Sequence, residues 1–322
     1  MRYLWFLSLL LLMLPHAVSA APACAKREAV RPRLDTLRDT MATGRFVSYS
    51  PTGLKKWREG TATPDEKSIH DDLVALRPWF DGVITYGALD GLDRVPDVAA
   101  KLGSRAVILG VWDITDKKEI DRALAAAKRH PHLVVGLSLG NELVFGKRAS
   151  WDDLSKAIAR MRKEAPSLPL GATEPFAWWL KPEAKPVLGK LDFLLANAHP
   201  AFEPWFSDAP ARNGADFVVD VTGQVAEIYC GPILVKETGL PTRPASRNFT
   251  PARQAAFWKA LEAEMPPTRD RAFAGFAAFD APWRVYDETP GTDGLNPSEG
   301  AWGLFTVDRK PKPVMDGLPR LR

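Results

Sequence analysis

Cysteine and histidine, the side chains that most often bind zinc or iron, are rare in this chain. It has two cysteines and five histidines among 322 residues, and they are scattered without the spacing of a metal site. We therefore expect no metal and no cofactor. Blocks of like charge are also missing, because acidic and basic residues are interleaved and the formal net charge is only +4. This pattern argues against a nucleic-acid partner.

Long apolar runs are limited to the first twenty residues. Arg2 precedes the apolar stretch 4–14, which is too short to cross a membrane, and Val18-Ser19-Ala20 has the small residues of a cleavage site. The pattern predicts a signal peptide over residues 1–20 and a mature chain, 21–322, without an integral membrane segment. We expect export to the periplasm or the extracellular space. Removing Arg2 lowers the formal charge from +4 to +3.

Cys24 and Cys230 both belong to the mature chain. In an oxidising compartment they can form one disulfide, and two buried thiols are the alternative. Cys24 also lies close to the cleavage site, where a lipid-anchored protein has its modified cysteine. Ala21-Pro22-Ala23 lacks the leucine usual three positions before such a cysteine, but lipid anchoring stays open.

The mature chain alternates short apolar strands with amphipathic helices eight times. The runs are rich in Val, Ile, Leu, Phe and Ala, as expected for strands buried on both faces. Helical patterns cover 66–77, 117–129, 151–164 and 251–264, and Ser150 and Thr250 are good N-caps for the last two. The expected strands are 46–50, 82–86, 106–112, 134–140, 169–173, 193–198, 233–237 and 275–279.

Eight such units in a chain of this length predict an α/β fold, a single-domain (β/α)8 TIM barrel. An open, doubly wound sheet is the alternative. It usually has a glycine-rich phosphate loop after its first strand, whereas this chain has Tyr49-Ser50-Pro51-Thr52-Gly53. No linker or repeat divides the mature chain.

Two glutamates follow apolar strands at the points where the chain must turn. Glu142 ends the run that begins at Val134, and Glu237 ends Ile233-Leu234-Val235-Lys236-Glu237. Catalytic groups of a barrel collect at the carboxyl ends of its strands. A pair of carboxylates there is the equipment needed to cleave a glycosidic bond. A surface position or an ion pair is the alternative for either one alone.

Their roles follow from their neighbours. Mutual repulsion should raise the pKa of Glu142, making it the acid/base, while Glu237 stays ionised as the nucleophile. Asn141, directly before Glu142, is suited to hold the 2-hydroxyl of the sugar.

These motifs resemble those of glycoside hydrolase family 17, retaining (β/α)8 enzymes that cleave or transfer β-1,3-glucan. Gly140-Asn141-Glu142 is similar to the acid/base motif of the retaining barrels, and Val235-Lys236-Glu237-Thr238-Gly239-Leu240-Pro241 to the nucleophile motif of the family. The resemblance continues in order along the mature chain, through Tyr49-Ser50-Pro51, Thr85-Tyr86-Gly87, Gly110-Val111-Trp112, Asn197-Ala198-His199-Pro200, the segment from Phe279-Asp280 to Trp283-Arg284, and the segment from Glu299 to Phe305.

Three positions depart from the family pattern. Leu240 stands where the family has Trp, Ala281 where it usually has an acid, and Arg284 where it has Lys. The missing acid removes a group that, by the resemblance, supports the site or binds a sugar.

The resemblance, with the aromatic and polar residues near strand ends, gives a set of candidate substrate contacts. Flat aromatic faces suit the C–H faces of pyranose rings, although each ring could equally belong to the core. His199 is expected to bind a sugar or orient Glu237, Glu299 to support the nucleophile region, and Glu174 to be either a sugar ligand or a surface residue. The candidates are Tyr49, Tyr86, Trp112, Asn141, Glu174, Trp178, Asn197, His199, Phe279, Asp280, Trp283, Glu299 and Trp302.

The leading interpretation is an endo-type β-1,3-glucan hydrolase, expected to be a monomer. A transglycosylase with the same pair of glutamates is one alternative, since it differs only in whether a sugar hydroxyl or water completes the reaction. A non-catalytic glucan-binding protein of the cell envelope is another, but it would typically have lost one of the two carboxylates.

Overall fold

Eight parallel strands form a closed barrel. The computed structural model describes residues 27–55, 62–286 and 296–321. Each strand pairs with its neighbours in sequence, and the first pairs with the last, which confirms the predicted (β/α)8 barrel. The strands are β1 (Phe46–Tyr49), β2 (Gly82–Thr85), β3 (Ala106–Val111), β4 (Val134–Asn141), β5 (Leu170–Pro175), β6 (Leu194–Asn197), β7 (Ile233–Glu237) and β8 (Arg271–Gly275).

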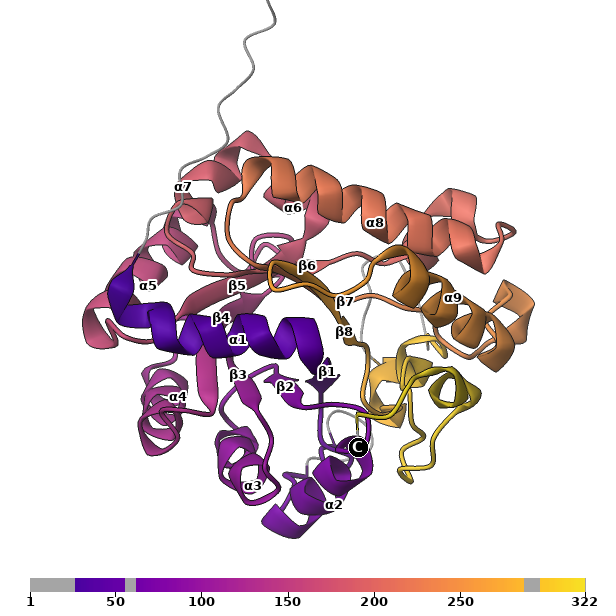
Figure 1. Cartoon of the computed structure of the whole chain (residues 1–322), viewed down its shortest axis with the longest axis horizontal. Coiled ribbons are helices and arrows are strands. Elements are labelled where there is room, and N and C mark those ends of the chain that lie inside the picture. Colours follow the sequence, from indigo (N-terminus) through magenta and orange to yellow (C-terminus); the bar gives the residue numbers. More distant parts are fainter. Residues whose placement is uncertain (1–26, 56–61, 287–295, 322) are drawn as a thin grey trace, which may run out of the picture.

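Helices surround these strands as an outer layer (Figure 1). Their order is α1 (Arg31–Thr43), α2 (Glu66–Leu76), α3 (Val95–Lys101), α4 (Lys117–Arg129), α5 (Trp151–Glu164), α6 (Phe176–Trp179), α7 (Lys185–Leu188), α8 (Ala211–Ile228) and α9 (Pro251–Glu264). The predicted helices 117–129, 151–164 and 251–264 are confirmed with their bounds. Ser150 forms a capping box with Asp153, and the Thr250 side chain accepts the Arg253 amide.

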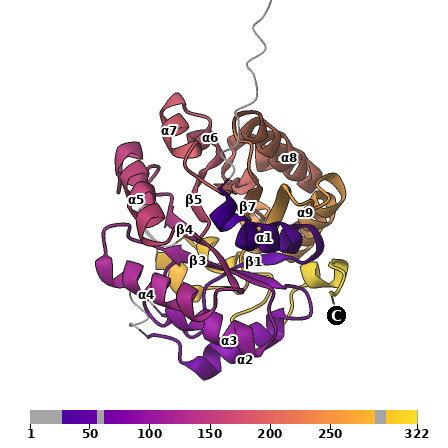
Figure 2. The same ribbon diagram turned by 60° about the vertical axis from the view of Figure 1, so that its left-hand side comes forward.

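The barrel interior is filled by apolar side chains, and α1 closes one end of it. Figures 1 and 2 show α1 lying across the strands. Its Leu37 and Met41 join an inner cluster with strand residues such as Phe46 and Phe193. The Phe193 ring lies so close to β4 and β5 that a Cβ on Gly136 or Gly171 would come within 2.6 and 2.3 Å of it. Glycine at these positions lets an aromatic ring fill the centre of the barrel. The sequence analysis did not predict α1.

The predicted position of the last strand, 275–279, is wrong. The strand is β8, Arg271–Gly275, which pairs with β7 through residues 271–273 and with β1 through residues 274 and 275. Residues 276–279 have the stronger β-prone pattern, but they form the segment that follows the strand. Its Ala278 amide donates to the Ser48 carbonyl, so this segment still runs beside the end of β1.

None of the helices in the described part of the chain has the length and apolar character that a membrane span requires. Cys230, just after α8, is disulfide-bonded. Cys24 lies outside the described residues, as does the expected signal peptide, so their pairing and export stay predictions.

Candidate active site

The two predicted catalytic glutamates lie at the same rim of the barrel, the carboxyl ends of the strands. Glu142 directly follows β4, and Glu237 is the last residue of β7. Asn197, at the end of β6, connects them: its Nδ2 donates to Glu142 Oε1 at 2.8 Å, and its Cα pairs with that of Glu237 in the β6–β7 ladder. The closed parallel sheet therefore brings together two carboxylates that are 95 positions apart in the sequence.

The backbone of Glu142 adopts an uncommon conformation. Its φ is +55°, in the left-handed region, and that of Gly140 is +79°. A non-glycine residue in this region is strained and persists only where its surroundings hold it. Here the Glu142 amide donates to the Thr173 carbonyl at 2.8 Å, and its carbonyl accepts the Gly146 amide at 2.9 Å. Strain at a candidate catalytic residue is typical of a functional site.

Glu174 holds the loop that follows Glu142. Its carboxylate oxygens accept the backbone amides of Val144 and Phe145 at 2.8 and 3.1 Å, and the residue is 1 % exposed. Burial outweighs these hydrogen bonds and raises its pKa to about 7. Glu174 is thus neither a surface residue nor an open sugar ligand, which corrects both predictions. It positions the turn that carries Glu142.

Positive charge and hydrogen bonding surround Glu237. His199 Nε2 lies 3.6 Å from Glu237 Oε2, and Lys236 Nζ lies 3.5 Å from Oε1. Burial alone would raise the pKa of Glu237, but the hydrogen bond of His199 and the charges of Lys236 and Arg284 outweigh it and lower the pKa to about 2. Glu237 is therefore ionised at any pH at which an ordinary enzyme works.

Glu142 has the opposite environment. Burial raises its pKa, and the negative charge of Glu237 raises it further, against the weaker effect of the Asn197 hydrogen bond. The pKa values of the two carboxyl groups are therefore displaced in opposite directions at the same rim of the barrel. An acid and a nucleophile require a displacement of this kind, and their assignment to Glu142 and Glu237 stays a prediction.

Several buried polar atoms beside the glutamates have no hydrogen-bond partner among the described residues. Among them are Asn197 Oδ1, His199 Nδ1 and Thr238 Oγ1. Buried polar groups are nearly always paired in proteins, so a cluster of unpaired ones is suited to a polar ligand such as a sugar. Asn141 and Tyr86 complete this side of the site. The Lys236 ammonium bonds to Asn141 Oδ1 at 2.6 Å and lies over the Tyr86 ring at 4.1 Å from its centroid.

Exposed aromatic rings line the same rim. Trp112 follows β3 and is 45 % exposed, and Phe145, after β4, is 46 % exposed and packs edge-on against Trp178 at 4.8 Å. Phe202 and Trp205, in the loop after β6, are 55 % and 46 % exposed. Rings that are this open can bind pyranose faces. The sequence analysis missed Phe145 and Phe202. The one feature of the sequence that could have indicated them is their position in loops that follow strands.

Three predicted contacts are buried instead. Tyr49 is 0 % exposed and its hydroxyl donates to Asp72 at 2.7 Å, while Phe279 packs against Tyr49 and Phe305 in the core. Trp302 is 2 % exposed within a cluster that includes His199 and Phe276. These placements contradict direct sugar contact by Tyr49 and Phe279, and Trp302 is not the open platform that was predicted.

Two predicted acids near β8 form ion pairs. Asp280 accepts the Lys312 ammonium at 2.6 Å and the Gly303 amide at 2.9 Å. Glu299 pairs with Arg284 at 2.9 Å, and Arg284 in turn contributes positive charge at Glu237. Glu299 is thus linked to Glu237 through Arg284. Trp283, directly before Arg284 in the sequence, is half-buried.

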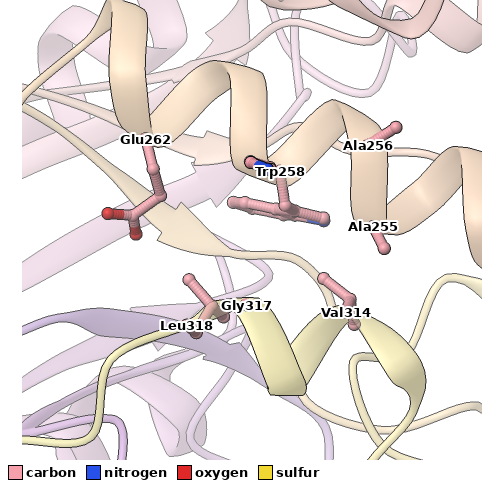
Figure 3. A pocket seen from close by; sticks show the side chains of 8 residues that line it. Ala255, Ala256, Trp258, Glu262, Val314, Gly317 and Leu318 are labelled. Atoms are coloured by element: carbon pink, nitrogen blue, oxygen red, sulfur yellow. The ribbon is translucent and has the colours of Figure 1, made fainter.

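A separate apolar hollow of about 180 Å³ lies between α9 and the 3-10 helix Pro313–Gly317 (Figure 3). Trp258, Val314 and Leu318 line it, with Glu262 at one side. Neither Glu142 nor Glu237 lines this hollow, so it is separate from the site described above. In the described ranges, no three His, Cys, Asp or Glu side chains are grouped to hold a metal ion.

A (β/α)8 barrel with two glutamates at the carboxyl ends of β4 and β7 has the arrangement of a glycoside hydrolase. Residues 47–303 match the BtgE/BtgC glycoside hydrolase domain, and the chain belongs to this family.

Individual relatives agree with this assignment. The chain is 26 % identical over 265 residues to a glucan 1,3-β-glucosidase of Arthroderma benhamiae, an alignment that covers 77 % of this chain and 84 % of the relative. Its fold is similar to a family 17 β-1,3-glucanosyltransferase from Rhizomucor miehei (TM-score 0.65, 20 % identity, 84 % and 96 % of the two chains). It is also similar to an endo-laminarinase from Formosa Hel1_33_131 (TM-score 0.67, 19 % identity, 85 % and 86 %). These findings support the resemblance to family 17.

Replacing Glu174 by alanine should weaken both stability and catalysis. The Val144 and Phe145 amides lose their acceptor, which should lower the free energy of unfolding by about 1–3 kcal/mol, measured in urea. The turnover rate on a glucan should fall as well, because the strained Glu142 is then less firmly held. Glu183→Ala, at an exposed glutamate, is the matched control.

The stabilisation of the folded protein by Glu174 depends on pH, and the sign of this dependence follows from the raised pKa. The folded pKa of Glu174, about 7, lies above its ordinary value of 4.5, so the folded protein keeps this proton where the unfolded chain loses it. The stabilisation by Glu174 should therefore decline as the pH rises from about 4.5 to 7. The measurement is the difference in the free energy of unfolding between the wild type and Glu174→Ala. If this difference grew as the pH rose from about 4.5 to 7, the raised pKa of Glu174 would be contradicted.

Proposed function

We propose that the protein is a retaining glycoside hydrolase that cleaves β-1,3-glucan. The observation that carries this proposal is the placement of Glu142 and Glu237 at the carboxyl ends of β4 and β7, joined through Asn197, with their pKa values displaced in opposite directions. The substrate is supported by the relatives: a glucan 1,3-β-glucosidase, an endo-laminarinase, and a β-1,3-glucanosyltransferase whose active-site mutant binds laminaritriose.

The reaction has two steps. First, the Glu237 carboxylate attacks the anomeric carbon as the bond to the leaving oxygen breaks, and Glu142 gives its proton to that oxygen. One sugar chain leaves as an alcohol, and the other stays esterified to Glu237. Then Glu142, now ionised, takes a proton from water, and the water oxygen displaces Glu237. Two inversions at the same carbon retain its configuration.

Neighbouring groups assist these steps. The Asn141 oxygen is occupied by Lys236, so its NH2 group is free to donate to the sugar 2-hydroxyl. Such a bond strengthens as positive charge develops on the ring. His199 and Asn197 offer their unpaired buried atoms to further hydroxyl groups.

Substitution of the glutamates tests the proposal. Glu237→Gln should abolish the release of reducing sugar from laminarin, because an amide cannot form the glycosyl ester. Glu142→Ala should lose about 10²–10⁴-fold on substrates with poor leaving groups, and it should regain activity with azide, which needs no general base. Near-normal turnover by Glu237→Gln would overturn the assignment of the nucleophile.

Transglycosylation is a second candidate function, favoured by the exposed rings of Trp112 and Phe202 after different strands. A sugar held on such rings places a hydroxyl against the glycosyl-enzyme, and positioning can outweigh the concentration of water. At high concentrations of β-1,3-oligosaccharide we expect products longer than the substrate, and hydrolysis alone at low concentrations.

Time-resolved mass spectra measure this partition. Trp112→Ala and Phe202→Ala should reduce the longer products more than hydrolysis. Val74→Ala, at an exposed apolar residue of α2, serves as the control. A purely hydrolytic series at every concentration would exclude transfer.

Export is the remaining part of the proposal, supported by the pattern of residues 1–20 and by the disulfide-bonded state of Cys230. Cys24 is the only other cysteine in the chain. Mass spectrometry of protein from the producing cells should find a mature chain that starts at Ala21 and a peptide pair joined through Cys24 and Cys230. Free thiols on both residues in exported protein would contradict the bridge.

A further inference from the structure

Lys236 is a lysine in the interior of a strand, and it is buried completely. It belongs to β7, and its side chain is 1 % exposed. Lysine is almost never fully buried unless its ammonium group is paired. The preceding residues of β7, Ile233, Leu234 and Val235, are all apolar. The position of this charge therefore needs an explanation that the fold alone does not give.

A local irregularity of the sheet turns Lys236 toward the active site. Val235 pairs with Ala196, but the next pair is Glu237 with Asn197, so Lys236 is an extra residue on β7. Successive side chains of a regular strand point to opposite faces, whereas an extra residue re-aims one of them. As a result, the side chains of Lys236 and Glu237 approach each other to 3.5 Å although they are neighbours in sequence.

The Lys236 ammonium has three partners, and all belong to the active site. It donates to Asn141 Oδ1 at 2.6 Å, lies 3.5 Å from Glu237 Oε1, and is 4.1 Å from the centroid of the Tyr86 ring. Its charge acts on both catalytic groups, since it favours the ionised forms of Glu237 and of Glu142. The ionisable groups that face this region from neighbouring elements are Glu142, Glu237, Tyr86, His199 and Arg284.

We propose that Lys236 is a positioning residue of the catalytic site, whose ammonium group attracts and orients the Glu237 carboxylate and whose hydrogen bond aims the Asn141 amide at the substrate. This role rests on the proposed glycoside cleavage. Lys236 does not reach the reacting atoms itself. It acts through Glu237 on nucleophilic attack and through Asn141 on the sugar hydroxyl.

The charge and the hydrogen bond can be separated by two substitutions. Lys236→Met keeps most of the length of the side chain and removes both. Lys236→Gln removes the charge and keeps an NH2 donor that can reach toward Asn141. Lys310→Met, at an exposed lysine, is the matched control for loss of one positive charge from the protein.

The decisive measurement is the pH dependence of kcat/KM on laminarin, whose acid limb reports ionisation of the nucleophile in the free enzyme. An opposite charge this close typically lowers a carboxyl pKa by about 1–3 units, so the acid limb should move upward by about 1–3 pH units in both Lys236 variants. In Lys236→Met, kcat should also fall by about 10²-fold, because Asn141 is no longer held. Lys236→Gln should recover part of kcat with the acid limb still displaced.

A merely structural lysine would give a different result. Thermal unfolding first identifies which variants are folded, and either folded variant decides the question. An acid limb that coincides with that of the wild type and of Lys310→Met would overturn the proposal. If the wild-type enzyme left laminarin intact, the proposed substrate would be wrong instead. The role of Lys236 would then be decided by the pH dependence of inactivation by a 2-deoxy-2-fluoro-β-glucosyl fluoride, which also requires an ionised nucleophile.

Discussion

Two buried carboxyl groups at one rim of the barrel repel when both are ionised, and their surroundings displace their pKa values in opposite directions. The rest of the site meets this constraint. Burial and the charge of its partner raise the pKa of Glu142, while His199, Lys236 and Arg284 lower that of Glu237. The same type of side chain therefore has two different proton affinities, and the difference arises from what surrounds each one.

The barrel supplies these surroundings through local departures from regular geometry. Glu142 lies in the left-handed region of φ, held by Glu174 through the loop that follows it. Lys236 is an extra residue in β7. In a regular strand its side chain and that of Glu237 would point to opposite faces of the sheet. A regular parallel sheet fixes where the strand ends meet. Its irregularities decide where the side chains at those ends point.

The sequence predicted the features that depend on pattern and order. Eight apolar runs alternating with helices predicted the barrel. The capping residues Ser150 and Thr250 predicted the first residues of two helices correctly. The two candidate catalytic glutamates could be found because Glu237 ends β7 and Glu142 directly follows β4. Glu237 could be identified from the apolar run that it ends, without further knowledge of the fold.

The sequence could not predict features that depend on contacts between distant residues. Tyr49 ends a strand as Glu237 does, but its hydroxyl donates a hydrogen bond to Asp72 of α2, a partner that no local pattern reveals. Glu174 was ambiguous because the backbone amides that it accepts belong to the loop after another strand. Lys236 was overlooked beside Glu237, although a charge inside an apolar strand is itself a signal.

The most direct test of the central claim, that Glu237 is the ionised nucleophile and Glu142 the acid, is to trap the covalent intermediate. A 2-deoxy-2-fluoro-β-glucosyl fluoride slows the second step more than the first, so a labelled enzyme should accumulate. Peptide mapping of the inactivated protein by mass spectrometry should then place one sugar on Glu237 and none on Glu142. A label on any other residue, or an active enzyme that never acquires one, would contradict the double-displacement mechanism.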